Sequence, residues 1–337
     1  MESAAFVMVP NTTETNNGTE SPRIDSDISM TQQIMLVVLF IAVLVFILGG
    51  NLLTIMAVVR TPALRTVPNM YVVSLAVADF LTGAIIPYYA ISFFPSLQEK
   101  LNANKYMCLS RYALFHLFVA ESIACMVVIA FDRFLFIKYP LHYRSITSHR
   151  KAGIVIAGTW VASILVGMVP LWEYHWNNDC TSFEVLTRVF RLYGLIPGFF
   201  LCLLLTALFY GYIVKKALAH QREALARRAS QLSGSSNPVV SSANDWKSVK
   251  VFLLVFGVFV ACWFPNFTLV FVGYFADVPK TLVFFTVILG FLNSGMNCII
   301  YAWQNHHFNN AFKTILCGRR RRTSTSSDGP TQVVRIS

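Results

Sequence analysis

The chain has 337 residues, of which 55% are hydrophobic and only 13% are charged, and its formal net charge is +11 at pH 7. Soluble domains carry roughly 25% charged residues, so this composition argues against a soluble protein. A basic chain can indicate a nucleic-acid partner, but these cations gather in particular connections between apolar stretches, and we expect no nucleic acid.

The first 30 residues are polar and rich in Asn, Thr, Ser and Glu. They lack the basic-then-apolar layout of a cleaved signal peptide. Two N-glycosylation sequons begin at Asn11 and Asn17. Residues 1–30 are therefore predicted to form an extracellular glycosylated tail, although the tripeptide also arises by chance.

Seven long apolar stretches follow. Each approaches the ~20 residues with which a helix crosses the hydrocarbon core. Because lipid offers no hydrogen bonds to the backbone, these stretches should be helices. The sequence predicts an all-α, seven-transmembrane-helix bundle over 31–305. The stretches are 34–59, 69–93, 107–131, 152–172, 192–214, 251–275 and 281–303.

The cations between these stretches alternate from one connection to the next. Most belong to the first, third and fifth connections and the C-terminal tail, including the run Arg319 to Arg322. Short basic loops stay cytoplasmic. We therefore expect the N-terminus outside and the C-terminus in the cytoplasm. The third inner loop is expected over about 217–244, and the cytoplasmic tail over 318–337.

Two of the seven cysteines fall in the predicted outer connections, Cys108 and Cys180. That compartment is oxidising, so we expect them to pair and to pin the second outer loop across the bundle. Cys317 follows an amphipathic stretch, which predicts a short eighth helix over 306–317 on the cytoplasmic side. Its position beside a basic cluster favours palmitoylation, with an unmodified thiol as the alternative.

Several polar side chains lie inside the apolar stretches, where a charge costs at least a few kcal/mol. Asp79, Ser122, Asn293 and Asn297 fall at one depth. They predict either a site for a hydrated cation or an interhelical hydrogen-bond network. Glu121 is a second buried acid. We expect it to bond to a neighbouring helix, with a ligand-binding or proton-sensing role as the alternative.

The third stretch ends in Asp132-Arg133-Phe134. Arg133 could be an ordinary end charge that reaches toward the interface. It could instead act as a switch, paired with an acid in one state and released in another. Asp245, at the cytoplasmic entry to the sixth stretch, is the candidate partner.

These residues together resemble the rhodopsin-like, or class A, family of G-protein-coupled receptors over about residues 31–317. Each motif alone is weak, but they occur in order, with landmarks in every helix. The matching residues are Gly50-Asn51, Leu75 to Asp79, Cys108, Asp132 to Phe134, Pro140-Leu141, Trp160, Tyr210, Phe259, Cys262 to Pro265, and Asn297 to Tyr301.

The resemblance implies a plasma-membrane receptor for an extracellular ligand, with a heterotrimeric G protein, an arrestin and a receptor kinase as partners. Arg133 and Leu141 would contact the G protein, and Trp263 would relay ligand contact to the sixth helix. Tyr210 and Tyr301 would move inward on activation. The resemblance also favours sodium as an allosteric ion at the Asp79 group, and no other cofactor.

The chain departs from the family pattern at two helix-bending positions. Cys298 stands where the seventh helix normally has a proline, and Cys202 where the fifth helix has one, with Pro197 about one turn earlier. These departures leave the switching geometry open, because proline is a frequent cause of helix kinks.

The predicted ligand pocket is mostly apolar and aromatic. The local sequence of several helices resembles that of adenosine receptors, but Val270 and Phe291 replace their purine-binding residues. We expect a small, uncharged or weakly polar ligand, or a lipid. An enzyme is disfavoured, and a transporter using Asp79 and Glu121 is the alternative. The pocket residues are Phe115, His116, Val119, Trp263, Asn266, Phe267 and Phe291.

Overall fold

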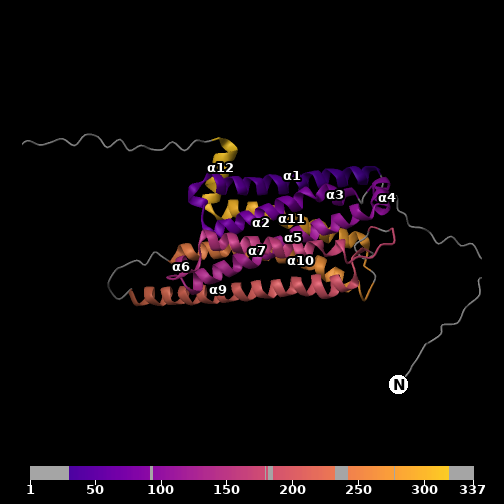
Figure 1. Ribbon diagram of the computed structural model, residues 1–337. Helices are drawn as coiled ribbons and strands as arrows, with labels where there is room; N and C mark the ends of the chain where they lie inside the picture. The colour runs from indigo at the N-terminus through magenta and orange to yellow at the C-terminus, as the bar shows by residue number, and fades with distance from the viewer. Residues whose placement is uncertain are drawn as a thin grey trace, which may run out of the picture.

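The computed structural model describes residues 30–91, 94–178, 180, 185–231, 242–276 and 278–318. The sequons at Asn11 and Asn17 and the tail after Gly318 lie outside these ranges. Within them, seven helical segments are long and apolar enough to cross a membrane. They run side by side as one bundle (Figure 1), which confirms the all-α fold. The spans are Val37–Arg60, Val67–Ala90, Lys105–Lys138, His149–Leu171, Phe190–Ala219, Leu253–Val272 and Phe285–Gln304.

The helices follow one another through short connections. We call the end near α4 the disulfide end and the end near α6 and α12 the Arg133 end (Figure 1). The elements are α1 (Met30–Arg60), η1 (Pro62–Leu64), α2 (Val67–Ala84), α3 (Ile86–Ala90), α4 (Pro95–Ala103), α5 (Lys105–Lys138), α6 (Tyr143–Ile146), α7 (His149–Met168), η3 (Val169–Leu171), η4 (Phe190–Leu195), α9 (Ile196–Gln231), α10 (Ser242–Val272), α11 (Lys280–Gln304) and α12 (His306–Cys317).

Helix α5 is the centre of the bundle and packs against α2, α7 and α9. Close approach depends on small residues, as is usual between helices in membranes. A Cβ atom at Gly167 of α7 would lie 2.4 Å from the Leu117 side chain of α5. A Cβ atom at Gly295 of α11 would lie 2.2 Å from the Phe46 ring of α1. Substitution at either glycine therefore has to push two helices apart.

The two proline departures have different structural outcomes. At Pro197 the preceding turn, η4, is a π-helix, because proline has no N–H for the usual bond and its ring clashes with the carbonyl four residues earlier. The departure from α-helical geometry in this span thus lies nearer the disulfide end than Cys202 does. Helix α11 runs uninterrupted through Cys298, whose thiol lies 2.5 Å from the place a Gly50 Cβ would occupy.

The segment predicted as the third inner loop, about 217–244, is helical at both of its ends. Helix α9 continues to Gln231, and α10 begins at Ser242. The segment 217–231 is rich in Ala, Arg, Leu, Glu and Gln, which are strong helix formers. Local propensity therefore carries α9 beyond the apolar span.

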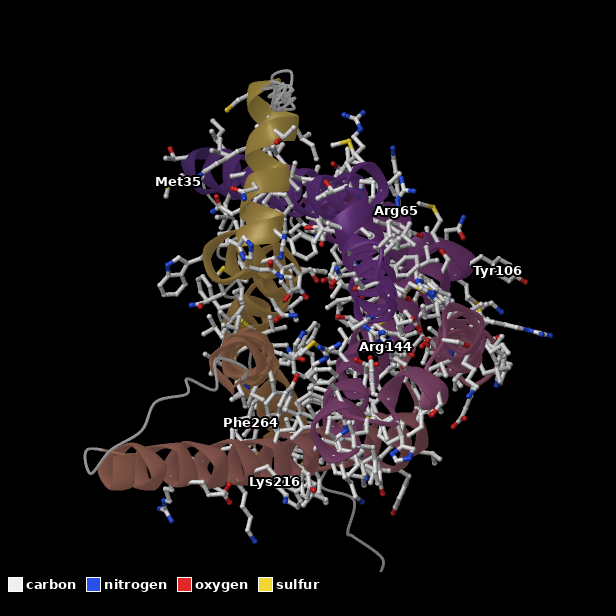
Figure 2. The ribbon with its side chains drawn as sticks, turned by 90° about the vertical axis from the view of Figure 1, so that its left-hand side faces the viewer. Met35, Arg65, Tyr106, Arg144, Lys216 and Phe264 are labelled. Atoms are coloured by element: carbon white, nitrogen blue, oxygen red, sulfur yellow. A yellow bond between two sulfur atoms is a disulfide. The ribbon has the colours of Figure 1, made fainter. Side chains whose placement is uncertain are left out.

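The amphipathic eighth helix, α12, covers His306–Cys317. The Asn305 side chain accepts a hydrogen bond from the His307 N–H (3.0 Å) and caps its start. Gly318 ends it in the left-handed region, at φ 62°. Phe308 and Phe312 are buried, whereas Cys317 is exposed. Figure 2 looks onto the Arg133 end, with the yellow α12 in front of the bundle.

Candidate functional site

A cavity of about 940 Å³ lies between α5, α9, α10 and α11. All seven residues that the sequence singled out for the pocket line it. Its size is at the upper end of the range for small-molecule sites. Most of its wall is aliphatic or aromatic, so it favours a ligand with substantial apolar surface.

An aromatic group built around Phe115 forms one wall. The Phe115 ring centroid lies 5.0 Å from that of Tyr89, 5.8 Å from Phe291 and 6.1 Å from Trp263. Trp263 packs against Gly290 of α11, where an added Cβ would lie 3.0 Å from its ring. Trp263 therefore lies between Phe115 and Gly290, two residues before Pro265 in α10.

The polar side chains predicted for the pocket are held by neighbours. His116 Nδ1–H donates to the carbonyl of Tyr112 at 2.7 Å, because a carbonyl can only accept. Asn266 Nδ2 donates to Thr286 Oγ1 at 3.1 Å. The imidazole Nε2 of His116 and the amide oxygen of Asn266 are the groups that these two bonds leave for other partners.

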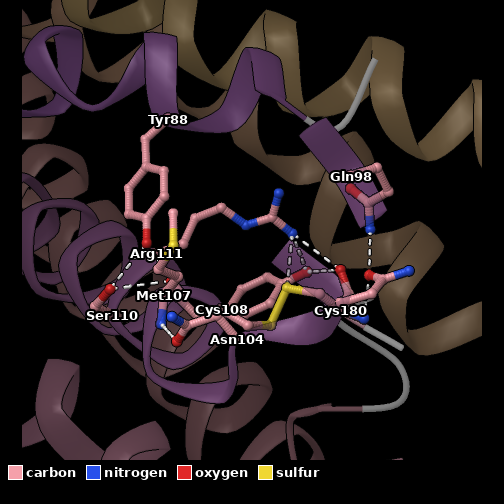
Figure 3. The surroundings of a disulfide bond; sticks show 10 residues. Tyr88, Gln98, Asn104, Met107, Cys108, Ser110, Arg111 and Cys180 are labelled. Carbon is pink, nitrogen blue, oxygen red and sulfur yellow. Dashed lines mark hydrogen bonds between the residues drawn. A yellow bond between two sulfur atoms is a disulfide. The ribbon is translucent and has the colours of Figure 1, made fainter. Parts of the chain in front are cut away.

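The disulfide between Cys108 and Cys180 is present, with their Cα atoms 5.8 Å apart. It ties the segment after α7 to the start of α5, as expected. Figure 3 shows Arg111 beside it. The Arg111 guanidinium donates to the Cys180 carbonyl (3.0 Å) and to the Tyr112 hydroxyl (2.9 Å).

Sequence reasoning missed two arginines in the cavity wall. Arg111 is 3% exposed and Arg191 is 8% exposed, and both line the cavity. Arg191 Nε donates to the Tyr274 hydroxyl at 3.0 Å. A signal for Arg111 was available, since it lies three residues after Cys108 and therefore on the same helix face. Arg191 lies in the π-helical turn, where the usual helix periodicity does not predict which residues face the cavity.

The group around Asp79 joins α2, α5 and α11. Ser122 Oγ donates to Asp79 Oδ1 at 3.2 Å, and Asn297 Nδ2 donates to Oδ2 at 2.7 Å. The buried Asn293 Oδ1 has no hydrogen-bond partner in the described part of the chain. Among the described residues no group of three or more His, Cys, Asp or Glu side chains could hold a metal ion. The candidate cation site predicted from the sequence is this oxygen-rich group.

Glu121 is fully buried and joins α2, α5 and α7. Four side chains donate to its carboxylate, and Trp160 Nε1 in turn donates to Ser74 Oγ at 3.0 Å. The expected bond to a neighbouring helix is thus present, with one donor from α2 and two from α7. The donors are Ser74 (3.1 Å), Cys125 (3.2 Å), Thr159 (3.0 Å) and Ser163 (3.0 Å).

Asp132 bridges two groups at the opposite end of α5. It forms an ion pair with Arg133 at 2.5 Å and accepts a hydrogen bond from the Tyr143 hydroxyl at 2.7 Å. Burial, followed by the Asp132 charge, raises the pKa of Tyr143, so this hydroxyl keeps its proton and donates. Asp245 lies in α10, but its side chain is outside the described residues. Leu141, in the loop before α6, is 92% exposed.

The predicted switch tyrosines are both buried between Arg133 and the middle of the bundle. The hydroxyls of Tyr210 and Tyr301 have no hydrogen-bond partner within the described residues. Tyr301 stacks on Phe308 of α12 (5.3 Å), and Tyr210 lies 5.4 Å from Phe256 of α10. Phe259, predicted to act with them, is buried one turn further along α10.

Comparison with known proteins follows this geometry. The family model of the 7 transmembrane receptor (rhodopsin family) matches residues 50–301. Adenosine receptor A3 of Ovis aries is 29% identical over 286 residues, covering 79% of this chain and 84% of that one. Histamine H2 receptor of Cavia porcellus is 31% identical over 318 residues, covering 90% and 84%.

A third relative, 5-hydroxytryptamine receptor 4 of Cavia porcellus, is 29% identical over 346 residues, covering 90% of this chain and 88% of its own. These relatives are receptors of one family with different names. The matched region includes all seven spans except the start of the first and the last three residues of the seventh. The chain is therefore not an enzyme but a member of the rhodopsin family of seven-transmembrane receptors, a multi-pass plasma-membrane protein that signals through G proteins.

Proposed function

We propose that this receptor binds a small, weakly polar or lipid-like extracellular ligand in the cavity beside Trp263 and activates a heterotrimeric G protein at the Arg133 end. The observation that carries the proposal is the cavity of about 940 Å³ lined by all seven pocket residues. Amine binding is not favoured, because Phe115 stands where amine receptors place an acid.

The proposed orientation has the disulfide end outside the cell and the Arg133 end in the cytoplasm. It is supported by the basic residues near the Arg133 end, such as Arg65, Arg144 and Lys216, since basic loops stay cytoplasmic. Asn11 and Asn17 are then candidate glycosylation sites. The exposed Cys317, at the end of α12, is the candidate palmitoylation site, and the tail over 318–337 the candidate target of a receptor kinase and an arrestin.

Signalling in this proposal proceeds by exchange of partners at Arg133. In the resting state Asp132 holds the guanidinium, and Tyr143 holds Asp132 by a hydrogen bond. Outward movement of α10 at this end would free Arg133 for the G protein, while the exposed Leu141 provides an apolar contact. Asp245 is the proposed second acid that restrains Arg133 at rest.

The Asp79 group is the proposed sodium site. Asp79, Ser122, Asn293 and Asn297 provide hard oxygen atoms, which suit an alkali cation, and the Asn293 oxygen has no partner among the described residues. When bound, sodium would offset the buried Asp79 charge. It would favour the resting state only if it binds that state more tightly.

Nucleotide exchange on a purified G protein tests the receptor function. Membranes that contain the parent chain are screened with lipids, purines, amines and peptides. Arg133→Ala is expected to abolish exchange while ligand binding persists, and Asp245→Ala to raise ligand-free exchange about fivefold if the lost contact contributes ~1 kcal/mol.

The two variants should move in opposite directions, which a folding defect cannot imitate. If both reach the surface and exchange nucleotide like the parent, the proposed switch is wrong. Substrate uptake by proteoliposomes that is lost in Asp79→Asn or Glu121→Gln would instead support the transporter alternative.

A further inference from the structure

The ligand cavity has a side chamber between α5, α7 and α9. Its walls are formed by Ala120 and Ala124 of α5, Ala162 and Val166 of α7, and Gly198 and Cys202 of α9. Five of these six side chains are no larger than a thiol. The chamber exists because small residues occupy positions where larger ones would fill the space between three helices.

This chamber reaches the lipid-facing surface of the bundle. Ala162, Val166 and Gly198 line it and are exposed. Helices α7 and α9 each pack against α5, whereas contact between α7 and α9 is sparse. In a bilayer this arrangement brings acyl chains, rather than water, to the wall of the chamber.

The disulfide end of the same cavity has the opposite character. The guanidinium groups of Arg111 and Arg191 belong to its wall, with the amides of Gln98 and Asn102. The described residues that line the cavity include no Asp or Glu. Arginine recognises carboxylate and phosphate groups through paired N–H donors.

The two ends are separated by the length of a lipid chain. From Arg111 to Ile123, both of which line the cavity, α5 rises about 18 Å at 1.5 Å per residue. A ligand that reaches both ends must therefore be long, apolar along most of its length and acidic at one end.

We infer that the ligand is a single-chain lipid with an acidic head: its hydrocarbon chain occupies the side chamber between α7 and α9, and its head contacts Arg111 and Arg191. The inference rests on the proposed function, since it assigns a chemical class to the ligand of that cavity. A carboxylate and a phosphate head share this chemistry.

The first test uses palmitate with a photoreactive diazirine in its chain, on the full-length protein in nanodiscs of uncharged phospholipid. Ala162→Leu fills the chamber and should lower palmitate labelling about tenfold, equivalent to ~1.4 kcal/mol. Ala157→Leu is the matched control, because Ala157 is also exposed on α7 but does not line the cavity. Labelling of this control should stay within about twofold of the parent.

A second measurement needs no variant. Unlabelled palmitate should protect Cys202 from a maleimide, while the exposed Cys317 reacts at the same rate, as read by peptide mass spectrometry. Two outcomes would overturn the inference, because the chamber would then hold no single acyl chain. In the first, Ala162→Leu leaves palmitate labelling unchanged and palmitate does not slow the reaction of Cys202. In the second, cholesterol protects Cys202 and palmitate does not.

The head is tested with palmitate, a lysophosphatidate and the neutral palmityl alcohol as competitors of labelling. Arg191→Gln should weaken both acids about tenfold and leave the alcohol unchanged. Arg188→Gln is the matched control. The guanidinium carbons of Arg188 and Arg191 lie 5.8 Å and 5.6 Å from the centroid of the Tyr274 ring, but Arg188 does not line the cavity.

Equal competition by acid and alcohol in the parent protein would overturn the acidic head. Preference for lysophosphatidate over palmitate, or the reverse, identifies the source of the charge within the same inference. Labelling is measured without a G protein, so the two hypotheses can fail separately. If no ligand drives nucleotide exchange, only the receptor function is contradicted. If another ligand drives exchange and palmitate does not label the protein, only the lipid inference is contradicted.

Discussion

Two buried carboxylates of the bundle, Glu121 and Asp79, have different surroundings. Glu121 accepts hydrogen bonds from four side chains of α2, α5 and α7. Asp79 accepts from three side chains, Ser122, Ser294 and Asn297, and the neighbouring buried oxygen of Asn293 has no partner among the described residues. A carboxylate with its acceptors filled stabilises helix packing, whereas oxygen atoms left over beside a carboxylate suit a cation.

The largest effect should follow from removing the acceptor at the filled site. Glu121→Leu is expected to lower the free energy of unfolding by about 3 kcal/mol, because three donors on neighbouring helices lose their acceptor and interhelical hydrogen bonds in membranes contribute about 0.6–1.7 kcal/mol each. Thermal unfolding in detergent measures the change. Glu99→Leu, at an exposed position on α4, is the control; equal stability of the two variants would contradict a structural role for Glu121.

The next effect distinguishes the two acids by their response to sodium. At tenfold its dissociation constant, sodium should stabilise the parent protein by about 1.4 kcal/mol, relative to an equal concentration of N-methylglucamine. Asp79→Asn should remove that stabilisation, and Glu121→Gln should retain it. A sodium response that survives in Asp79→Asn would assign the ion elsewhere and make both acids structural.

A smaller effect separates the two serines that serve these acids. Ser122→Ala and Ser163→Ala each remove one hydroxyl donor and should each lower stability by ~0.6 kcal/mol. Only Ser122→Ala should also weaken sodium, by about fivefold if the oxygen contributes ~1 kcal/mol to binding. The measurement is a sodium titration of the unfolding midpoint, and equal titrations for both variants would show that Ser122 is no ligand.

The smallest effect concerns a third carboxylate, Asp132, which shares its charge between Arg133 and Tyr143. Tyr143→Phe removes one hydrogen bond from the proposed resting state and should raise ligand-free nucleotide exchange about twofold, from ~0.5 kcal/mol. The raised pKa of Tyr143 keeps its donor in place below the ordinary value of about 10. Ligand-free exchange in the parent should therefore not rise through this contact until the pH passes that value. Lower exchange in Tyr143→Phe would contradict the restraint.

Much of the site could be found without the structure, because the signals were local. All seven residues that the sequence singled out for the pocket line the cavity. The sequence also singled out the cysteine pair and the Asp79 group. It did not find Arg191, whose π-helical turn breaks the usual periodicity, nor the side chamber, which no single segment contains. It also did not predict that the fifth helix continues to Gln231, since the helix over 217–231 follows from propensity rather than from hydropathy.

The sequence alone determined the number of membrane spans, their helical form and the pairing of Cys108 with Cys180, because backbone polar groups in lipid leave few alternatives and few cysteines were on one side of the membrane. The tertiary structure decided which acid meets which donor. Glu121 and Ser122 are neighbours in sequence, and their side chains point about 100° apart around α5, as 3.6 residues per turn require. The packing of α5 against α2, α7 and α9 fixes its rotation. That rotation directs Glu121 toward donors of α2 and α7 and Ser122 toward Asp79.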